Sequence, residues 1–265
     1  MEKSTFIGLV LGLIAVGLGM VLKGASLTVL WNPAAILIIF VGTAATLFMG
    51  FPLKELKKFP TLIKLIFTEQ KLMPKTELIA LFVNLATITR REGLLALDNH
   101  LENVEDEFLK SGVQMIIDGS DIEFVKNVML EEIEAIEERH RAGALIFSQA
   151  GTYAPTLGVL GAVVGLIAAL GNLSDIDVLG HSIAAAFVAT LMGIFSGYVL
   201  WHPIANKLKR LSSREMELKH IMVEGVVAIG SGISPIALEQ YLMVYLSQEE
   251  RANANIQKEG AGDDQ

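Results

Sequence analysis

The stretch Ala154–Gly165, APTLGVLGAVVG, contains no charged side chain, yet it carries a proline, a threonine and three glycines. In a water-exposed helix each glycine costs about 1 kcal/mol and an interior proline about 3 kcal/mol. In a membrane the balance differs, because lipid tails are as apolar as leucine and helices associate through close packing of small residues. The stretch therefore predicts a helix that crosses a membrane and packs closely against another helix.

The distribution of charge along the chain supports this prediction. Only 19% of the 265 residues are charged, whereas soluble domains average about 25%. Asp, Glu, Lys and Arg are absent from four blocks, and each block has room for the roughly 20 apolar residues that cross a ~30 Å hydrocarbon core. The sequence thus predicts an all-α polytopic membrane protein with four transmembrane helices, at about Phe6–Leu22, Pro33–Phe51, Ala150–Leu170 and Ser182–Trp201.

Basic residues near the predicted spans indicate their orientation, because short loops rich in Lys and Arg stay in the cytoplasm. Such residues follow spans two and four and precede span three, whereas the two other connections hold only Lys23 between them. We therefore expect both termini in the cytoplasm. The expected organisation is transmembrane helices 1 and 2 in residues 1–51, a large helical cytoplasmic region in 52–149, transmembrane helices 3 and 4 in 150–204, cytoplasmic C-terminal helices in 205–246 and a disordered tail in 247–265.

Local signals predict helices in the cytoplasmic region. One helix is expected to end at Gly93, after an apolar pattern with 3–4 spacing. Ser120 and Glu123 match a capping box, in which both side chains bond free amides at a helix start. We expect the helix that they open to run past Arg141 into the third span. The acidic run Glu131–Glu138 is interpreted as the solvated face of this helix.

Small residues form a stripe in the third span, and the fourth span repeats it at the same steps of three and four. The residues that define the two stripes are Gly158, Gly161 and Gly165 in the third span and Ala186, Ala189 and Gly193 in the fourth. Two interpretations are open. The stripes can form a tight helix pair within one chain, or they can offer a surface on which a helix of a partner packs and turns.

Polar groups inside the spans are few. The hydroxyls of Thr156, Thr190 and Tyr198 can bond their own backbone or line an ion path. Pro155 frees a backbone carbonyl, which suits a hinge or a polar path. The four spans hold no carboxylate, although a proton relay needs an ionisable group in the membrane. An ion-conducting role would therefore require a carboxylate from a partner.

Three segments resemble the flagellar stator subunits of the MotA/TolQ/ExbB superfamily: QAGTYAPTLGVLGAVVGLIAAL (Gln149–Leu170), AAFVATLMGIFSGYVLWHPIANKLKR (Ala185–Arg210) and RREGLLALD (Arg90–Asp98). The resemblance covers nearly the whole chain. It implies a subunit of the bacterial inner membrane, five copies of which surround two copies of a single-span partner, MotB. The partner's helix would supply the proton-carrying aspartate, and the complex would turn ion-motive force into torque on the rotor protein FliG.

The resemblance also implies roles for individual residues. Those on the ion path or in coupling would be Pro155, Thr156, Ala162, Thr190, Tyr198 and Pro203, and those at the rotor contact would be Arg90 and Asp98. The small-residue stripes would pack on the partner's helix. Sodium-driven relatives carry a threonine where this chain has Ala162, whose methyl group offers no oxygen to a sodium ion. The predicted transported ion is therefore the proton, and no cofactor is expected.

Other classes of function remain as alternatives. A TolQ/ExbB-like energiser of envelope partners would have three spans, and a sodium-driven stator would differ in its ion. A membrane scaffold or an enzyme is disfavoured, since the five histidines are scattered and no phosphate-binding loop or nucleophile elbow is present. The chain has no cysteine, and its net charge of −8 argues against a nucleic-acid partner.

Overall fold

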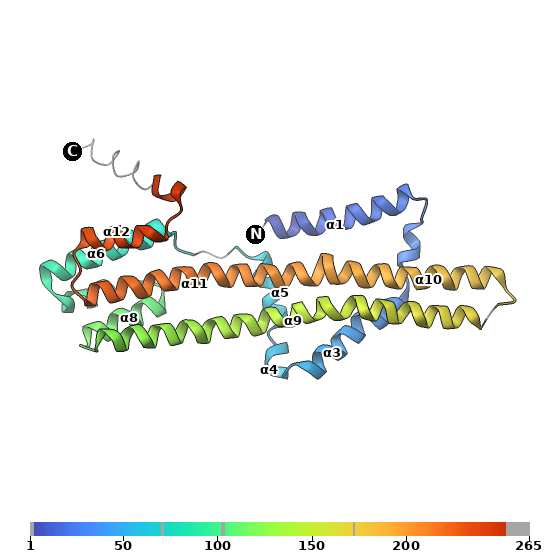
Figure 1. Ribbon diagram of the computed structural model, residues 1–265, viewed down its shortest axis with the longest axis horizontal. Helices are drawn as coiled ribbons and strands as arrows, with labels where there is room; N and C mark the ends of the chain where they lie inside the picture. The colour runs from blue at the N-terminus through green and yellow to red at the C-terminus, as the bar shows by residue number, and fades with distance from the viewer. Residues whose placement is uncertain (1–2, 70–71, 102–103, 172, 253–265) are drawn as a thin grey trace. The chain divides into compact units, whose positions relative to one another are not determined.

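The computed structural model describes residues 3–69, 72–101, 104–171 and 173–252, and the chain divides into two compact units. Unit 1 consists of Met1–Gln70 and Arg139–Leu211, and unit 2 of Lys71–Glu138 and Ser212–Gln265. Every regular element in the described residues is a helix. Two long helices belong to both units: α9 begins in unit 2 and ends in unit 1, and α11 begins in unit 1 and ends in unit 2 (Figure 1).

Unit 1 holds the most apolar helices of the chain. In chain order its elements are α1 (Lys3–Leu22), η1 (Leu27–Leu30), α2 (Pro33–Ile36), η2 (Leu37–Val41), α3 (Gly42–Gly50), α4 (Leu53–Leu56), α5 (Phe59–Phe67), the second half of α9 (Ile122–Leu170), α10 (Ile176–Phe195), η4 (Ser196–Trp201) and the start of α11 (His202–Gly230). The segments η2 and η4 are π-helical. Both continue an α-helix, so each is a local change of winding inside a span.

Four helices are long and apolar enough to cross a membrane: Ser4–Leu22, Pro33–Gly50, Ile122–Leu170 and Ile176–Gly230. This confirms the all-α polytopic fold with four spans. As expected, α9 continues without a break past Arg141 into the third span. The fourth span continues in the same way into α11, which the sequence boundaries near residue 204 did not anticipate.

An aromatic cluster holds together the charged end of unit 1. Phe59 of α5 stacks on Phe147 of α9, with ring centroids 4.8 Å apart. The Trp201 ring lies 6.2 Å from Phe59 and 6.4 Å from Phe147. This cluster fixes the short helix α5 against α9 and η4. The apolar side chains of α1, in contrast, stay largely exposed, as expected for a helix that faces lipid.

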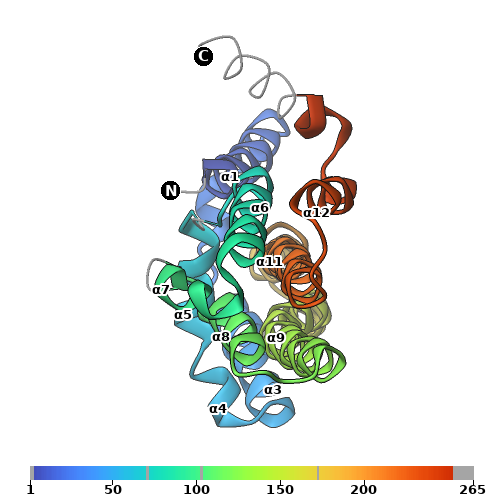
Figure 2. The same cartoon turned by 90° about the vertical axis from the view of Figure 1, so that its left-hand side faces the viewer.

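Unit 2 is built around large buried side chains. Its elements are α6 (Lys75–Glu92), η3 (Leu94–Leu97), α7 (Asp98–Leu101), α8 (Glu107–Ile117), the first half of α9, the end of α11, α12 (Pro235–Leu242) and η5 (Met243–Tyr245). Figure 2 shows α6, α8 and α12 beside the ends of α9 and α11. The core includes Phe82, Leu85, Met129 and Ile221, each almost inaccessible to solvent. Such burial is typical of a domain that folds in water.

Two helix ends in unit 2 test the predicted boundaries. As expected, α6 ends at Gly93, whose φ of 88° lies in the region that favours glycine. The capping box predicted at Ser120 is wrong. The Asp121 carboxylate caps α9 instead, accepting bonds from the amides of Glu123 at 3.0 Å and Phe124 at 3.1 Å. Because Ile122 is the first helical residue, the side chain of Asp121 is the one placed to reach these amides.

The predicted disordered tail was expected to begin at residue 247, and this start is wrong because residues 248–252 are helical. The Ser247 hydroxyl accepts a bond from the Glu250 amide at 3.2 Å, and the Ser247 amide donates to the Glu250 carboxylate at 2.7 Å. This reciprocal pair is a capping box, and the bond that the Ser247 amide donates to the carboxylate holds the pKa of Glu250 below its usual range. The guanidinium of Arg251 donates to the carbonyls of Leu246 and Val244. The rest of the predicted tail, 253–265, lies outside the described residues.

Candidate functional site

The third and fourth spans lie antiparallel and in direct backbone contact, as α9 and α10 show in Figure 1. A Cβ atom placed on Gly193 would lie 2.7 Å from the Gly158 Cα and 2.8 Å from the Ala154 carbonyl oxygen. A Cβ atom on Gly158 would lie 2.9 Å from the Ala189 carbonyl oxygen. Only hydrogen fits at these two positions, so the glycines are what allows the helices to approach this closely.

The same contact continues along both helices. A Cβ atom on Gly161 would lie 3.2 Å from the Ala189 Cβ, and one on Gly165 would lie 3.1 Å from the Ala186 Cβ. All six stripe residues therefore belong to one contact within a single chain, which is the first of the two interpretations. Their predicted packing on a partner's helix stays a prediction.

Pro155 lies inside the continuous helix α9 and faces η4. A Cβ atom on Gly197 would lie 2.7 Å from the Pro155 Cγ and 2.8 Å from the Gly151 carbonyl oxygen. Gly151 precedes Pro155 by four residues, so its carbonyl is the one that loses its helical N–H donor. In this structure the freed carbonyl lies against the π-helical turn of the neighbouring span. The hinge role of Pro155 stays a prediction.

The hydroxyl groups predicted for an ion path bond to their own helices. Thr156 donates to the Thr152 carbonyl and Thr190 to the Ala186 carbonyl, each at 3.4 Å. A hydroxyl that donates one bond keeps lone pairs for an incoming proton donor or ion. These contacts are therefore compatible with a path but do not require one.

The remaining path candidates differ in exposure. Ala162 is half-buried on α9, and Pro203 is exposed at the start of α11. The Tyr198 side chain is 65% exposed, and its ring lies 5.3 Å from the His202 ring. The Tyr198 side chain therefore lies outside the α9–α10 contact, where another molecule can reach it.

The predicted rotor-contact residues both lie on the surface of unit 2. Arg90 is in the last turn of α6, and Asp98 is the first residue of α7. Between them, Leu97 is fully buried and anchors the connection. Among the described residues, no ion pair joins either side chain to a partner. Both charges therefore remain available for an external partner.

A cavity beside Arg90 was not predicted from the sequence. Arg90 lines a cavity of about 280 Å³ together with Gly232, Ile233 and Ser234 of the turn between α11 and α12. This turn is formed by residues remote in sequence from Arg90, and Gly232 has a φ of 72°. A partner that contacts Arg90 therefore also meets this turn.

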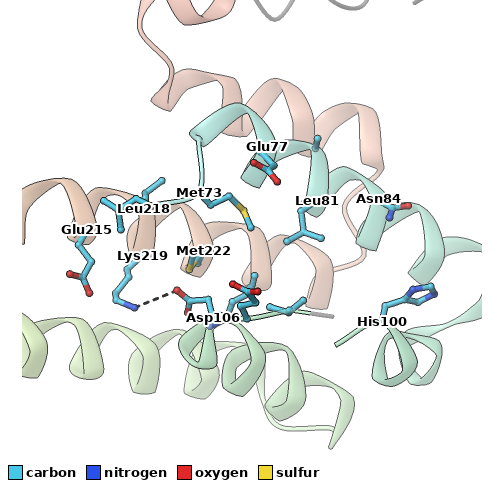
Figure 3. Close-up of a pocket in the computed structure, with 15 residues that line it drawn as sticks. Met73, Glu77, Leu81, Asn84, His100, Asp106, Glu215, Leu218, Lys219 and Met222 are labelled. Atoms are coloured by element: carbon cyan, nitrogen blue, oxygen red, sulfur yellow. Dashed lines mark hydrogen bonds and ion pairs between the residues drawn. The ribbon is translucent and has the colours of Figure 1, made fainter. Parts of the chain in front are cut away.

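A buried cation in unit 2, Lys219, was also not predicted from the sequence. Lys219 lines a cavity of about 820 Å³, and only 10% of its side chain is exposed (Figure 3). Its Nζ lies 3.9 Å from the Asp106 carboxylate and 4.5 Å from the centre of the Phe108 ring. Met216 and Met222 are buried three residues before and after it. Lys219 therefore occupies a position on the apolar face of the helix, and this spacing is the sequence pattern that could have indicated its burial.

Comparison with known proteins places this geometry in a family. Residues 100–220 match the MotA/TolQ/ExbB proton channel family, and residues 6–93 match the family described as Motility protein A N-terminal. Motility protein A of Bacillus subtilis is 55% identical over 251 residues, which cover 95% of this chain and 93% of that protein. The chain belongs to the MotA/TolQ/ExbB proton channel family.

Relatives in this family agree over both units. A chain in the structure of the flagellar MotAB stator complex from Bacillus subtilis superposes with a TM-score of 0.90 at 54% identity, covering 95% of this chain and 99% of that chain. A chain of MotAB from C. jejuni gives a TM-score of 0.88 at 31% identity, covering 94% and 97%. Chemotaxis protein PomA of Vibrio alginolyticus is 31% identical, with 95% of this chain and 98% of that protein covered.

Proposed function

We propose that this protein is a stator subunit of the flagellar motor, which joins a MotB-type partner to form a proton-conducting channel and turns ion-motive force into torque on the rotor. The observation that carries the proposal is its likeness to the MotAB stator chain from Bacillus subtilis, at a TM-score of 0.90 and 54% identity over nearly the whole length of both chains. The four spans also favour a stator over a three-span energiser.

The need for a partner follows from the chemistry of the spans. The predicted spans contain no carboxylate, so the ionisable group that a proton relay requires has to come from another chain. We propose two MotB copies in this role, inside a ring of five copies of this chain. Expression together with the MotB-type partner in cells that lack stators should restore swimming. Expression of either chain alone should not, and swimming without the partner would contradict the proposal.

The proposed transported ion is the proton. The stretch Gly161–Gly165 has an alanine at its second place, and the methyl group of Ala162 cannot coordinate sodium. Rescued cells should swim in sodium-free medium as long as the proton-motive force is maintained. Swimming that stops without sodium and returns when it is added would keep the stator function and overturn the choice of ion.

The proposed rotor contact is made by Arg90 and Asp98, which would engage charged residues of FliG. Support comes from their exposure on unit 2. Arg90→Glu should reduce torque by charge repulsion, while membrane levels of the protein stay normal. Arg214→Glu is the matched control, because Arg214 is exposed on α11 and lies outside the RREGLLALD segment. Equal torque in both variants would make Arg90 an ordinary surface residue.

The proposed location is the inner membrane, with both termini and unit 2 in the cytoplasm. The lysines and arginines that flank spans two, three and four support this orientation. A reactive tag at either terminus should be labelled only after the inner membrane is made permeable. Labelling of the N-terminal tag in intact spheroplasts would reverse the orientation.

A further inference from the structure

A cavity of about 410 Å³ opens in unit 1 where α1, α5 and the junction of η4 with α11 meet. One end of this cavity is polar: the Lys207 ammonium donates to the Ser4 hydroxyl at 3.3 Å, and the Thr5 hydroxyl donates to the Ile66 carbonyl at 3.1 Å. The rest of the lining is mainly apolar and includes Leu9, Phe67, Val199, Leu200 and Ile204. The cavity therefore has a charged end and a hydrocarbon end.

A second, apolar cavity lies further along α1. It measures about 270 Å³, shares Leu200 with the first, and is lined almost entirely by apolar side chains of α1, η1, η2, α10 and η4. The spanning part of α1 has no buried residue. Between the two cavities α1 contacts η4, because a Cβ atom on Gly12 would lie 2.6 Å from the Val199 Cγ1. On either side of this contact, apolar space remains between α1 and the neighbouring helices.

We propose that the first cavity binds an anionic membrane phospholipid, with its phosphate at Lys207 and Ser4 and an acyl chain along Leu9, Val199 and Leu200. Ser4 and Thr5 lie at the start of the uncharged run of α1, directly after Lys3, so they lie at the level where lipid phosphates occur at a membrane surface. A basic pocket between membrane helices is a known type of site for anionic headgroups.

The dimensions favour a lipid over a helix from a second copy of the chain. A helix with side chains is about 10 Å across, so 410 Å³ would hold only about 5 Å of its length, roughly one turn. A hydrocarbon chain is much thinner and can follow the apolar lining. Gly8 contributes to this space, because a Cβ atom there would meet no atom within 4 Å.

Two pairs of variants test the site in the assembly that the protein forms in membranes. Gly8→Leu fills the cavity, and Gly19→Leu is its control, because Gly19 lies on the same helix with open space around it and outside this cavity. Lys207→Gln removes the ammonium, and Lys209→Gln is its control, because Lys209 is exposed and does not line the cavity.

The readout is native mass spectrometry after reconstitution in nanodiscs of phosphatidylglycerol and phosphatidylethanolamine. We expect the parent protein to retain phosphatidylglycerol. Gly8→Leu and Lys207→Gln should each reduce the retained lipid at least twofold, and the two controls should match the parent. Equal retention in all variants would overturn the proposal. Unchanged lipid with a lower copy number in Gly8→Leu would instead identify the cavity as a contact between copies. Neither readout depends on motility, so the test stands apart from the proposed function.

Discussion

The α9–α10 contact of unit 1 and the core of unit 2 use glycine in opposite ways. In unit 1, the atoms that confront Gly158 and Gly193 belong to the backbone of the opposite helix. In unit 2, a Cβ atom on Gly225 would meet the ring of Phe82 at 2.5 Å, and one on Gly112 would meet the end of Met129 at 2.5 Å. Glycine brings two backbones together in the first region and makes room for a large side chain in the second.

The difference follows from the two solvents. In lipid, apolar burial gives no net drive for helices to associate, so the contact depends on backbones that approach closely. In water, burial of large apolar side chains supplies most of the stability, and a glycine that admits a phenylalanine ring increases that burial. A glycine stripe and a single glycine beside an aromatic residue therefore carry different structural information.

The largest expected effect is at the backbone contact. Gly193→Ala would place a methyl group 2.7 Å from the Gly158 Cα, and neither helix can yield without separating from the other. We expect destabilisation of about 3 kcal/mol, at the upper end for overpacking, with loss of swimming and lower membrane levels. Gly180→Ala on the same helix meets no atom within 4 Å and should behave as the parent. Equal behaviour of the two variants would break the comparison.

A smaller effect is expected in unit 2, where a side chain has to move. Gly225→Ala should lower stability by about 2 kcal/mol, measured as a fall in the thermal unfolding midpoint of the purified complex. Phe82→Leu alone should also destabilise, because it leaves a cavity. The double variant should be more stable than the sum of the two effects predicts, since the added methyl group occupies space left by the ring. Strict additivity would mean that the two residues do not compete for space.

The buried cation tests a third kind of packing. Lys219→Ala should destabilise unit 2 by about 1 kcal/mol, because it removes the buried stem and the contacts of the ammonium with the Phe108 ring and with Asp106, which is itself partly exposed. Lys219→Met keeps the volume of the stem and should lose less. The measurement is again the unfolding midpoint. Equal losses for methionine and alanine would show that charge, rather than packing of the stem, determines the role of Lys219.

The smallest effect concerns a surface tyrosine. The Tyr241 hydroxyl donates to the Glu224 carboxylate at 2.6 Å, and this bond, with some desolvation, raises the pKa of Tyr241 to about 12. The unfolded chain loses this proton near pH 10 and the folded protein near pH 12. The stabilising contribution is therefore complete below pH 10 and is lost as the pH rises toward 12.

Tyrosinate absorbance checks this titration when the parent is compared with Tyr241→Phe, so that the difference isolates one of the four tyrosines. Glu224→Gln should bring the midpoint back toward 10, because it removes the negative charge that opposes ionisation. A midpoint near 10 in the parent would show that the bond is absent in solution.

Much of the fold could be predicted from the sequence, because membrane insertion excludes charge over whole segments. The four uncharged blocks marked the spans, and the absence of a break near Arg141 indicated that α9 continues into the third span. Gly93 marked the end of α6, since a positive φ there favours glycine. These features depend on residues close in sequence or on the average properties of a long segment.

The features that the sequence did not predict depend on contacts between distant residues. The π-helical segment η4 begins where Gly197 meets the freed carbonyl of Gly151, and nothing in the local sequence of η4 signals this change. The stripe of small residues indicated close packing but could not say which helix fills it. The burial of Lys219 likewise depends on its contacts with Asp106 and Phe108, which are distant from it in sequence.

The central claim is that the small-residue stripes pack on each other within one chain, and a cysteine pair tests it most directly. The chain has no cysteine of its own, so Gly161→Cys with Ala189→Cys introduces the only thiols. The two Cβ atoms would lie about 3.2 Å apart, slightly inside the usual disulfide spacing of roughly 3.5–4.5 Å. Mild oxidation in membranes should give a crosslinked chain of monomer mass, with one peptide pair joined. Crosslinks only between chains would contradict the claim and return the stripes to a partner.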